Sequence, residues 1–261
     1  MISFVKRLAV QAGQICLKEQ NTITSNDITH KNPKDLVTKT DKKVEAFIIA
    51  AIENAFPGHG ILGEETGHNS QESPYLWIID PIDGTTSFIH GQPFYGVSIA
   101  LEKDGELILG AVYAPVFDQL FYGEKGRGAF LNDSPIQVSG THQMINAVMA
   151  TGFACLRAGL KPNNLGHFNH IVPQLRDIRR YGSAAMDLCY LAWGRLDGFW
   201  EMNLNIYDIA AGALILTEAG GKITDFTGGN RFPQKGVAAA NPLLHPLLIS
   251  NLQSQAHKDN T

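Results

Sequence analysis

The chain has 261 residues, enough for one large domain or two fused halves around a substantial buried core. Hydrophobic residues make up 44% of it and charged residues 18%, a balance that is typical of a globular protein and excludes an intrinsically disordered one. The net charge of −4 argues against binding that depends on broad electrostatic contact with nucleic acid, because such contact needs clustered positive charge.

The cysteines and the first segment indicate the compartment. Cys16, Cys155 and Cys189 are odd in number, widely separated and without a C-x-x-C pairing, so we expect buried, reduced thiols rather than a disulfide framework or a zinc site. Residues 2–20 have the apolar spacing of an amphipathic helix and not the pattern of a targeting signal. No apolar stretch approaches the roughly 20 residues that a membrane-spanning helix needs. We therefore expect a cytoplasmic protein with no membrane partner.

The first half of the chain begins with helices and continues with strands. After the helix over residues 2–20, a second helix is expected from Asp41, placed to be its N-cap, to Phe56. The glycines of residues 123–128 indicate a hairpin turn, because the segment lacks the Gly-Lys-Ser/Thr ending of a phosphate-binding loop. The strands expected in this half are Leu76–Ile79, Val97–Leu101, Leu107–Tyr113, Gln119–Tyr122 and Ala129–Leu131.

A polar stretch at Gln137–Gln143 separates the strand-rich first half from a second half with a different pattern of elements. It predicts two parts, residues 1–140 and residues 141–261. Strands and helices alternate beyond it. The elements expected there are strands at Ala147–Thr151, Gly198–Glu201, Lys222–Asp225 and Val237–Ala240, and helices at Leu165–Leu175, Ser183–Trp193, Tyr207–Ala219 and Pro242–Leu252. The fold class is therefore mixed α/β (α+β), with two halves that each hold a sheet covered by helices.

The most informative segment is Trp77–Phe88, where an apolar run leads to two carboxylates, Asp80 and Asp83. Acids three apart on a strand would diverge, but Pro81 is expected to break the strand, and the turn can bring both acids and the Ile82 carbonyl to one point. Mg²⁺ prefers such oxygen ligands. The alternative is that both aspartates only form the turn and cap a helix.

Residues 84–87, Gly-Thr-Thr-Ser, follow directly and can start a helix. The first N–H groups of a helix have no partner within it, and glycine lets the backbone approach an anion closely. An ordinary capped helix start is the alternative. Beside two carboxylates of the metal-binding type, we favour a phosphate site next to a divalent cation.

Three other acids lie in suggestive places. Glu64 follows a short apolar pair just ahead of the central segment, and Glu201 ends an expected strand. Asp208 stands at the start of a strongly apolar helix, where an acid favoured by the helix dipole is the simplest interpretation. None of the three indicates a site without the central segment.

Basic and histidine residues are further candidates for the site. His167 and His170 lie three apart on an expected helix, but no flanking acid supports a metal site, so a solvated helix face is expected. Arg179 and Arg180 precede the turn at Gly182, and their role stays open between holding substrate, lining a subunit contact and forming a surface ion pair.

Taken together, these motifs resemble the inositol monophosphatase family of magnesium-dependent, lithium-sensitive phosphatases, nearly from end to end of the chain. The resemblance implies a layered αβαβα sandwich of the sugar-phosphatase type and a homodimer. The motifs that carry it, in family order and at family spacing, are Gly63-Glu64-Glu65, Trp77–Phe88, Glu201 through Asp208 to Gly212, and Thr217–Gly221.

The resemblance also implies ligands for two or three Mg²⁺ ions. Glu64, Asp80 and the Ile82 carbonyl would hold the first ion. Asp80, Asp83 and Asp208 would hold the second, and a third, weaker ion would lie near Glu64, which we count among the catalytic residues.

Further roles follow from the same resemblance. Thr85 would orient the attacking water and would itself be held by Asp41. Lys31 matches a basic residue at the rim of the site. Ser87 stands where the family usually has asparagine, a departure that bears on the phosphate loop. The residues implied to contact substrate are Gly84, Thr85, Thr86, Gly182, Ser183, Ala184, Glu201 and Asp208.

The expected activity is hydrolysis of a small phosphate monoester, inositol 1-monophosphate foremost. Water would attack in line, without a phosphoenzyme, because no cysteine or serine nucleophile with a paired base is apparent. The alternatives are fructose 1,6-bisphosphate, histidinol phosphate or a 3′-phosphorylated nucleotide as substrate. A binding role with the transcription machinery is the alternative outside enzymes.

Overall fold

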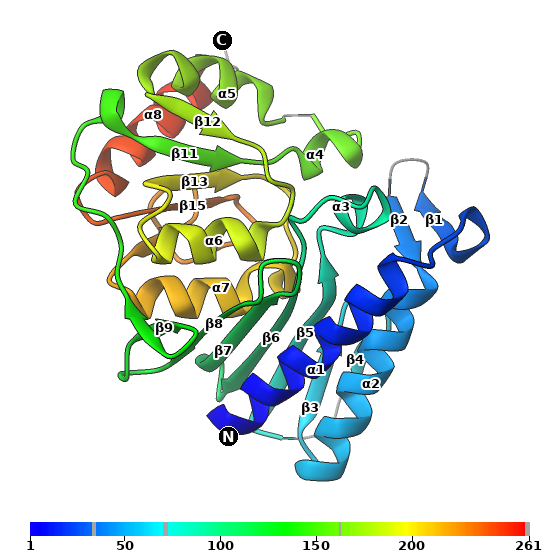
Figure 1. Cartoon of the computed structure of the whole chain (residues 1–261). Coiled ribbons are helices and arrows are strands. Elements are labelled where there is room, and N and C mark those ends of the chain that lie inside the picture. The colour runs from blue at the N-terminus through cyan, green and yellow to red at the C-terminus, as the bar shows by residue number, and fades with distance from the viewer. Residues whose placement is uncertain (33–34, 70–72, 162, 259–261) are drawn as a thin grey trace.

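The computed structural model describes residues 1–32, 35–69, 73–161 and 163–258 (Figure 1). Two long helices and an antiparallel meander make up its first half. The helices are α1 (Ile2–Gln20), α2 (Lys39–Ala55) and the short α3 (Thr85–Ile89). The strands are β1 (Ile28–Asn32), β2 (Asp35–Thr38), β3 (Gly60–Gly63), β4 (Gly67–Asn69), β5 (Tyr75–Asp83), β6 (Gly96–Lys103), β7 (Glu106–Ala114), β8 (Gln119–Glu124), β9 (Ala129–Leu131) and β10 (Ser134–Ile136).

These strands form an eight-stranded sheet in the order β10-β9-β8-β7-β6-β5-β3-β4, while β1 and β2 form a separate hairpin. Within the large sheet only β3 and β5 run parallel to each other. The helices α1 and α2 cover one face of the sheet (Figure 1). Their apolar stripes, with Val5 and Leu8 on α1 and Ile48 on α2, pack on Trp77 in one buried cluster, as the helical spacing of these residues requires.

The second half contains a smaller sheet in the order β12-β11-β13-β15-β14. Its helices are α4 (Ala154–Arg157), α5 (Leu165–Ile171), α6 (Ala184–Ala192), α7 (Ile206–Glu218) and α8 (His245–Lys258). Its strands are β11 (Val148–Thr151), β12 (Asp177–Arg179), β13 (Gly198–Glu201), β14 (Lys222–Thr224) and β15 (Val237–Ala240). Single turns of 3-10 helix occur at Ser25–Asp27, Met144–Asn146 and Val172–Gln174.

The layers alternate. The helices α6 and α7 lie between the two sheets, and α5 and α8 cover the outer face of the smaller one (Figure 1). This confirms the predicted αβαβα sandwich. A single buried cluster joins Ile78 and Ala100 of the large sheet to Ala150 and Phe199 of the small one through the middle helices. The division at residues 140 and 141 stays a prediction, and the two sheets lie on either side of it.

Two local predictions about the site segment were wrong. Asp41 is not the N-cap of α2. Thr38 is, and Asp41 lies at the third helical position, where its Oδ2 accepts from Thr38 N at 2.8 Å to complete a capping box. Pro81 does not end its strand, because β5 runs on to Asp83 past an irregularity in its pairing with β6.

The structure bears out the predicted state of the cysteines. Cys16, Cys155 and Cys189 are all buried and free. Across the part of the chain that the structure describes, no helix is both long enough and apolar enough to pass through a membrane.

Candidate active site

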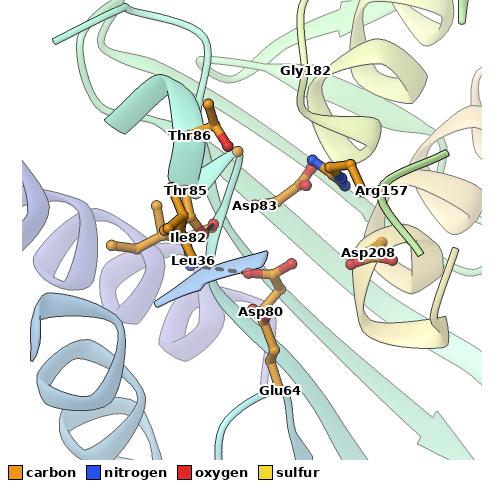
Figure 2. A pocket seen from close by; sticks show the side chains of 11 residues that line it. Leu36, Glu64, Asp80, Ile82, Asp83, Thr85, Thr86, Arg157, Gly182 and Asp208 are labelled. Carbon is orange, nitrogen blue, oxygen red and sulfur yellow. Dashed lines mark hydrogen bonds between the residues drawn. The ribbon is translucent and has the colours of Figure 1, made fainter. Parts of the chain in front are cut away.

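A polar cavity of about 80 Å³ lies where the end of β5, the start of α3 and the start of α7 meet (Figure 2). Asp80, Asp83 and Asp208 each place a carboxylate oxygen there, and these three atoms lie within 4.8 Å of one another. Segments far apart in sequence thus converge on one point. The lining residues are Leu36, Glu64, Asp80, Ile82, Asp83, Gly84, Thr85, Thr86, Arg157, Gly182 and Asp208.

The irregularity in β5 turns two acids toward this cavity. Asp80 pairs with Ser98 and Asp83 pairs with Gly96, so three steps along β5 oppose two along β6. The one extra residue is a bulge, which re-aims side chains that a regular strand would send to opposite faces. Ile82 N donates to Asp80 Oδ1 at 3.0 Å and closes the bulge. The predicted convergence of the two carboxylates therefore occurs within the strand rather than after it.

Asp83 is held from the other half of the chain. Its Oδ2 accepts from Ser183 Oγ and from Ala185 N, both at 2.6 Å. Ser183 is the N-cap of α6, and its hydroxyl also accepts from Met186 N at 3.2 Å. The start of α6 therefore fixes one oxygen of Asp83.

Asp208 combines two roles that the sequence left as alternatives. It lies in the first turn of α7, and its Oδ2 accepts from Asn205 N at 2.6 Å as part of a capping box. The same carboxylate lies beside Asp80 and Asp83 in the cavity. Capping thus orients an acid that also faces the cluster.

The cluster carries crowded negative charge. Burial raises the pKa of Asp80 well above its usual value, and the charges of Glu64, Asp83 and Asp208 raise it further. The pKa of Asp83 rises to about 7, mainly through burial, although the hydrogen bonds from Ser183 and Ala185 lower it. Burial and the charge of Asp83 raise the pKa of Asp208. Carboxylates this close ionise together when a cation neutralises them, and hard oxygen donors suit a divalent cation such as Mg²⁺.

Thr85 connects the cavity to α2. Its Oγ1 lies 3.3 Å from Asp41 Oδ1 and 3.1 Å from the Ile82 carbonyl oxygen. Asp41 is buried, and its pKa rises to about 6 because burial outweighs the hydrogen bonds from Thr38. A hydroxyl has one proton and can donate to only one of these acceptors at a time.

Gly84 precedes α3 with a φ of +98°, in the left-handed region. A Cβ on this residue would lie 2.8 Å from the Phe94 carbonyl oxygen, so both the backbone conformation and the space require glycine. The expected helix start over residues 84–87 is present as α3.

Of the predicted substrate contacts, Gly84, Thr85, Thr86, Gly182 and Asp208 line the cavity, whereas Ser183, Ala184 and Glu201 are not among its lining residues. Ser183 and Ala184 adjoin Gly182 and begin α6. Glu201 ends β13, is 5% exposed and accepts from Ala154 N at 3.0 Å. Burial raises the pKa of Glu201, while the positive charges of Arg180 and Arg157 lower it.

Two lining residues escaped the sequence analysis. Leu36 is an ordinary apolar residue of β2 and carries no sequence signal. Arg157 ends the short α4, in a stretch without a recognisable motif, and Figure 2 shows its guanidinium directed into the cavity. An isolated arginine in such a stretch could be assigned to the site only once the fold was known.

His167, His170 and Arg179 are not among the residues that line the cavity. The expected solvated face for His167 was wrong, because this residue is 7% exposed and packs edge-on against Phe226, which comes from a distant segment. His170 Nε2 lies 3.1 Å from Ser254 Oγ. Arg179 forms a surface ion pair with Asp177 at 2.6 Å, one of the alternatives left open.

Arg180, Ser87 and Lys31 are the remaining residues that the sequence singled out. Arg180 has its guanidinium beside Gly182, since a Cβ on that glycine would lie 2.9 Å from Arg180 Nη1. Ser87 is buried, and its Oγ lies 3.5 Å from the same Cβ position. Lys31 is part of β1, but its side chain lies outside what the structure describes.

The αβαβα layers, with a cluster of buried and half-buried carboxylates beside a hydroxyl-rich helix start, define a phosphatase of the sugar-phosphatase fold. The chain belongs to the inositol monophosphatase family, whose model matches residues 1–257. This family is metal-dependent, in agreement with the acidic cluster.

Individual relatives carry two kinds of name. An inositol-1-monophosphatase from Mesorhizobium japonicum is 38% identical over 95% of this chain and 94% of its own. The Nus factor SuhB of Pseudomonas aeruginosa is 40% identical over 97% of this chain and 96% of its own. The crystal structure of the extragenic suppressor protein suhB from Bartonella henselae, 38% identical, superposes with a TM-score of 0.91 over 96% of this chain and 97% of that one.

Proposed function

We propose that this protein hydrolyses small phosphate monoesters and that inositol 1-monophosphate is its foremost substrate. The observation that carries the proposal is the meeting of Asp80, Asp83 and Asp208 within 4.8 Å, in a cavity that Gly84 and Thr85 also line. The similarity to the inositol-1-monophosphatase of M. japonicum supports this choice of substrate.

The cation we propose is Mg²⁺, with two or three ions in the active site. Glu64, Asp80 and the Ile82 carbonyl are the proposed ligands of one ion, and Asp80, Asp83 and Asp208 those of a second. A third, weaker ion would lie near Glu64. Bound Mg²⁺ would neutralise the phosphoryl oxygens, lower the pKa of the attacking water and stabilise the leaving oxygen. We also propose that Li⁺ inhibits the hydrolysis.

The protein's own groups orient the reactants. When Thr85 Oγ1 donates to Asp41 Oδ1, its lone pairs are left to accept a hydrogen bond from a water in the cavity, which holds that water for attack. The backbone N–H groups at the start of α3, from Gly84 to Thr86, would bind the phosphate, because these three residues line the cavity and the first N–H groups of a helix have no partner within it. Glu64, from the opposite wall, completes the catalytic set.

The polyol part of the substrate would lie at the rim formed by residues 182–184, Glu201 and Asp208. The Ser183 hydroxyl is engaged with Asp83, so this stretch would contribute mainly backbone groups to substrate. Related sugar or nucleotide phosphates would use the same reacting centre and differ only at this rim, which keeps fructose 1,6-bisphosphate, histidinol phosphate and 3′-phosphorylated nucleotides as alternatives.

The test is phosphate release from a panel of these monoesters, with and without Mg²⁺ and then with added Li⁺. We expect turnover that requires Mg²⁺, is fastest with inositol 1-monophosphate and falls with Li⁺. Absence of turnover of every monoester over the whole range of Mg²⁺ concentrations would overturn the enzymatic proposal.

The similarity to a Nus factor supports a second role, association with the transcription machinery. An Asp83→Asn variant separates the two functions. Hydrolysis depends on that carboxylate, so we expect it to be lost, whereas a binding role on another surface would survive.

We also propose that the protein is a cytoplasmic homodimer. The three buried, free thiols suit a reducing compartment. Light scattering from the purified chain would measure the mass, with twice that of one chain as the expected result.

A further inference from the structure

A further acid near the site, Glu45, lies one helical turn after Asp41 on α2 and is 0% exposed. Its Oε2 accepts from Glu65 N at 3.0 Å, and its Oε1 accepts from Thr66 N at 2.8 Å. Both carboxylate oxygens therefore bind the backbone directly after Glu64. A buried carboxylate is costly unless it is hydrogen-bonded, and bonds of this charged kind are among the stronger ones in proteins.

The residue before Glu64 is shaped for the same acid. A Cβ on Gly63 would lie 2.6 Å from the carboxyl carbon of Glu45 and as close to its Oε1. Gly63 ends β3, so its lack of a side chain serves this close approach. The carboxylate of Glu45 thus lies against Gly63, the residue before Glu64, and accepts hydrogen bonds from the N–H groups of the two residues after it. Glu45 therefore contacts the backbone on both sides of Glu64.

The backbone of Glu64 is fixed on the sheet side as well. Glu64 N donates to the Ile79 carbonyl oxygen at 3.2 Å, next to the bulge that carries Asp80. Figure 2 shows Glu64 and Asp80 on the same wall of the cavity. The position of Glu64 relative to Asp80 therefore depends on the sheet from one side and on Glu45 from the other.

We propose that Glu45 is a positioning residue that holds Glu64 in place to bind a divalent cation. Residues four apart on a helix lie on the same face, so Asp41 and Glu45 extend from one side of α2 to two parts of one site. Asp41 holds Thr85, and Glu45 holds the segment that carries Glu64. One helix thereby sets the distance between the group that orients water and a metal ligand.

This inference rests on the proposed function, because it takes Glu64 as a metal ligand. Measuring metal binding in the absence of substrate tests the role of Glu45. Mn²⁺ is added to wild type, Glu45→Gln and Glu45→Ala, and the free ion is followed by electron paramagnetic resonance. Loss of an interaction that orients a ligand typically costs about 10- to 100-fold in affinity, so we expect at least a ten-fold loss for Glu45→Ala and a smaller one for Glu45→Gln.

Asp225→Asn is the matched control. Asp225 is 1% exposed and accepts from the backbone N–H groups of Thr227, Gly229 and Arg231, in a loop away from the cavity-lining residues. This variant removes the same kind of buried carboxylate. We expect its melting temperature to fall, while its Mn²⁺ affinity stays within about two-fold of wild type.

A double-mutant cycle adds a test that keeps the Glu45 carboxylate. Gly63→Ala should displace that carboxylate and weaken Mn²⁺ binding about ten-fold in the wild-type background, with little further effect in Glu45→Ala. Should Glu45→Ala fail to fold, Glu45→Gln, which nearly keeps the shape, and Gly63→Ala carry the test.

The outcomes are distinct. Wild-type affinity in folded Glu45→Gln and Gly63→Ala would overturn the role of Glu45 and leave the metal site intact. Equal weakening by the Asp225→Asn control would show a general effect of lost stability and would also overturn it. No Mn²⁺ binding by wild type would contradict the proposed function itself.

Discussion

The hydroxyl of Ser183 donates to Asp83 Oδ2 over 2.6 Å, although the two residues are 100 positions apart in the chain. Asp83 belongs to the large sheet, and Ser183 caps the helix that lies between the two sheets. The bond therefore connects the large sheet to the helical layer between the two sheets, at the acidic cluster itself. The site needs both halves of the chain, and their packing sets its geometry.

Ser183→Ala tests this connection. The variant leaves Ala185 N as a donor but removes the hydroxyl, so we expect the pKa of Asp83 to rise and phosphate release to fall about 10- to 100-fold. Ser183→Thr keeps a hydroxyl and should retain most activity. Equal rates for the alanine and threonine variants would show that the bond has no part in turnover.

Thr85→Ala separates water orientation from metal binding. Thr85 Oγ1 contacts Asp41 and the Ile82 carbonyl oxygen, but its hydroxyl is not a proposed ligand. We expect turnover to fall by about 10²-fold or more, while Mg²⁺ affinity, measured by calorimetric titration, stays near that of wild type. A parallel loss of both quantities would mean that the water-orienting role is misassigned.

The stability of the protein should respond to pH and Mg²⁺ together. Asp83 has its pKa raised to about 7 in the folded state, so the folded protein binds a proton that the unfolded chain releases near pH 4. Its contribution to the free energy of unfolding is therefore present at low pH and is lost as the pH rises from about 4 to about 7. The proposed Mg²⁺ would bind the ionised carboxylates and would offset that loss.

We accordingly expect the rise in melting temperature on adding Mg²⁺ to be small at pH 5 and larger at pH 8. Thermal unfolding across this range, with and without the ion, measures the difference and cancels contributions from distant groups. Asp83→Asn should show a weaker dependence on pH. A Mg²⁺ effect of the same size at both pH values would argue against titrating ligands.

Gly84→Ala probes the backbone at the start of α3. The substitution forces a side chain into a left-handed conformation and brings Cβ to 2.8 Å from the Phe94 carbonyl oxygen. Gly91→Ala is the control, because Gly91 also has a positive φ of 66° but open space around its Cβ position. Strain of this kind costs about 1–3 kcal/mol. Both variants should be less stable, and only Gly84→Ala should lose most of its phosphate release.

Much of the fold followed from local pattern. The strands Gly198–Glu201 and Val237–Ala240 have the bounds that were predicted, because each is a short apolar run between turn-forming residues. The convergence of Asp80 and Asp83 was predicted from the proline between them, although a bulge within the strand, and not the end of the strand, brings it about. The roles of the site residues came from the family resemblance and stay predictions.

Other features depend on contacts that a sequence does not display. An aspartate at the N-cap and one at the third helical position begin a helix equally well, so the place of Asp41 depended on Thr38. Pro81 was expected to end its strand, but a bulge accommodates it and the strand continues to Asp83. His167 packs against the ring of Phe226, which is distant in sequence. Glu45 looks like an ordinary polar helix residue in the sequence, and only the structure shows that it binds the backbone after Glu64.

The most direct test of the central claim is a crystal structure with Mn²⁺, in which anomalous scattering locates the ions. We expect peaks between Glu64 and Asp80 and between Asp83 and Asp208, inside the cavity of Figure 2. Ions bound elsewhere on the surface, with the cavity empty at saturating Mn²⁺, would contradict the account.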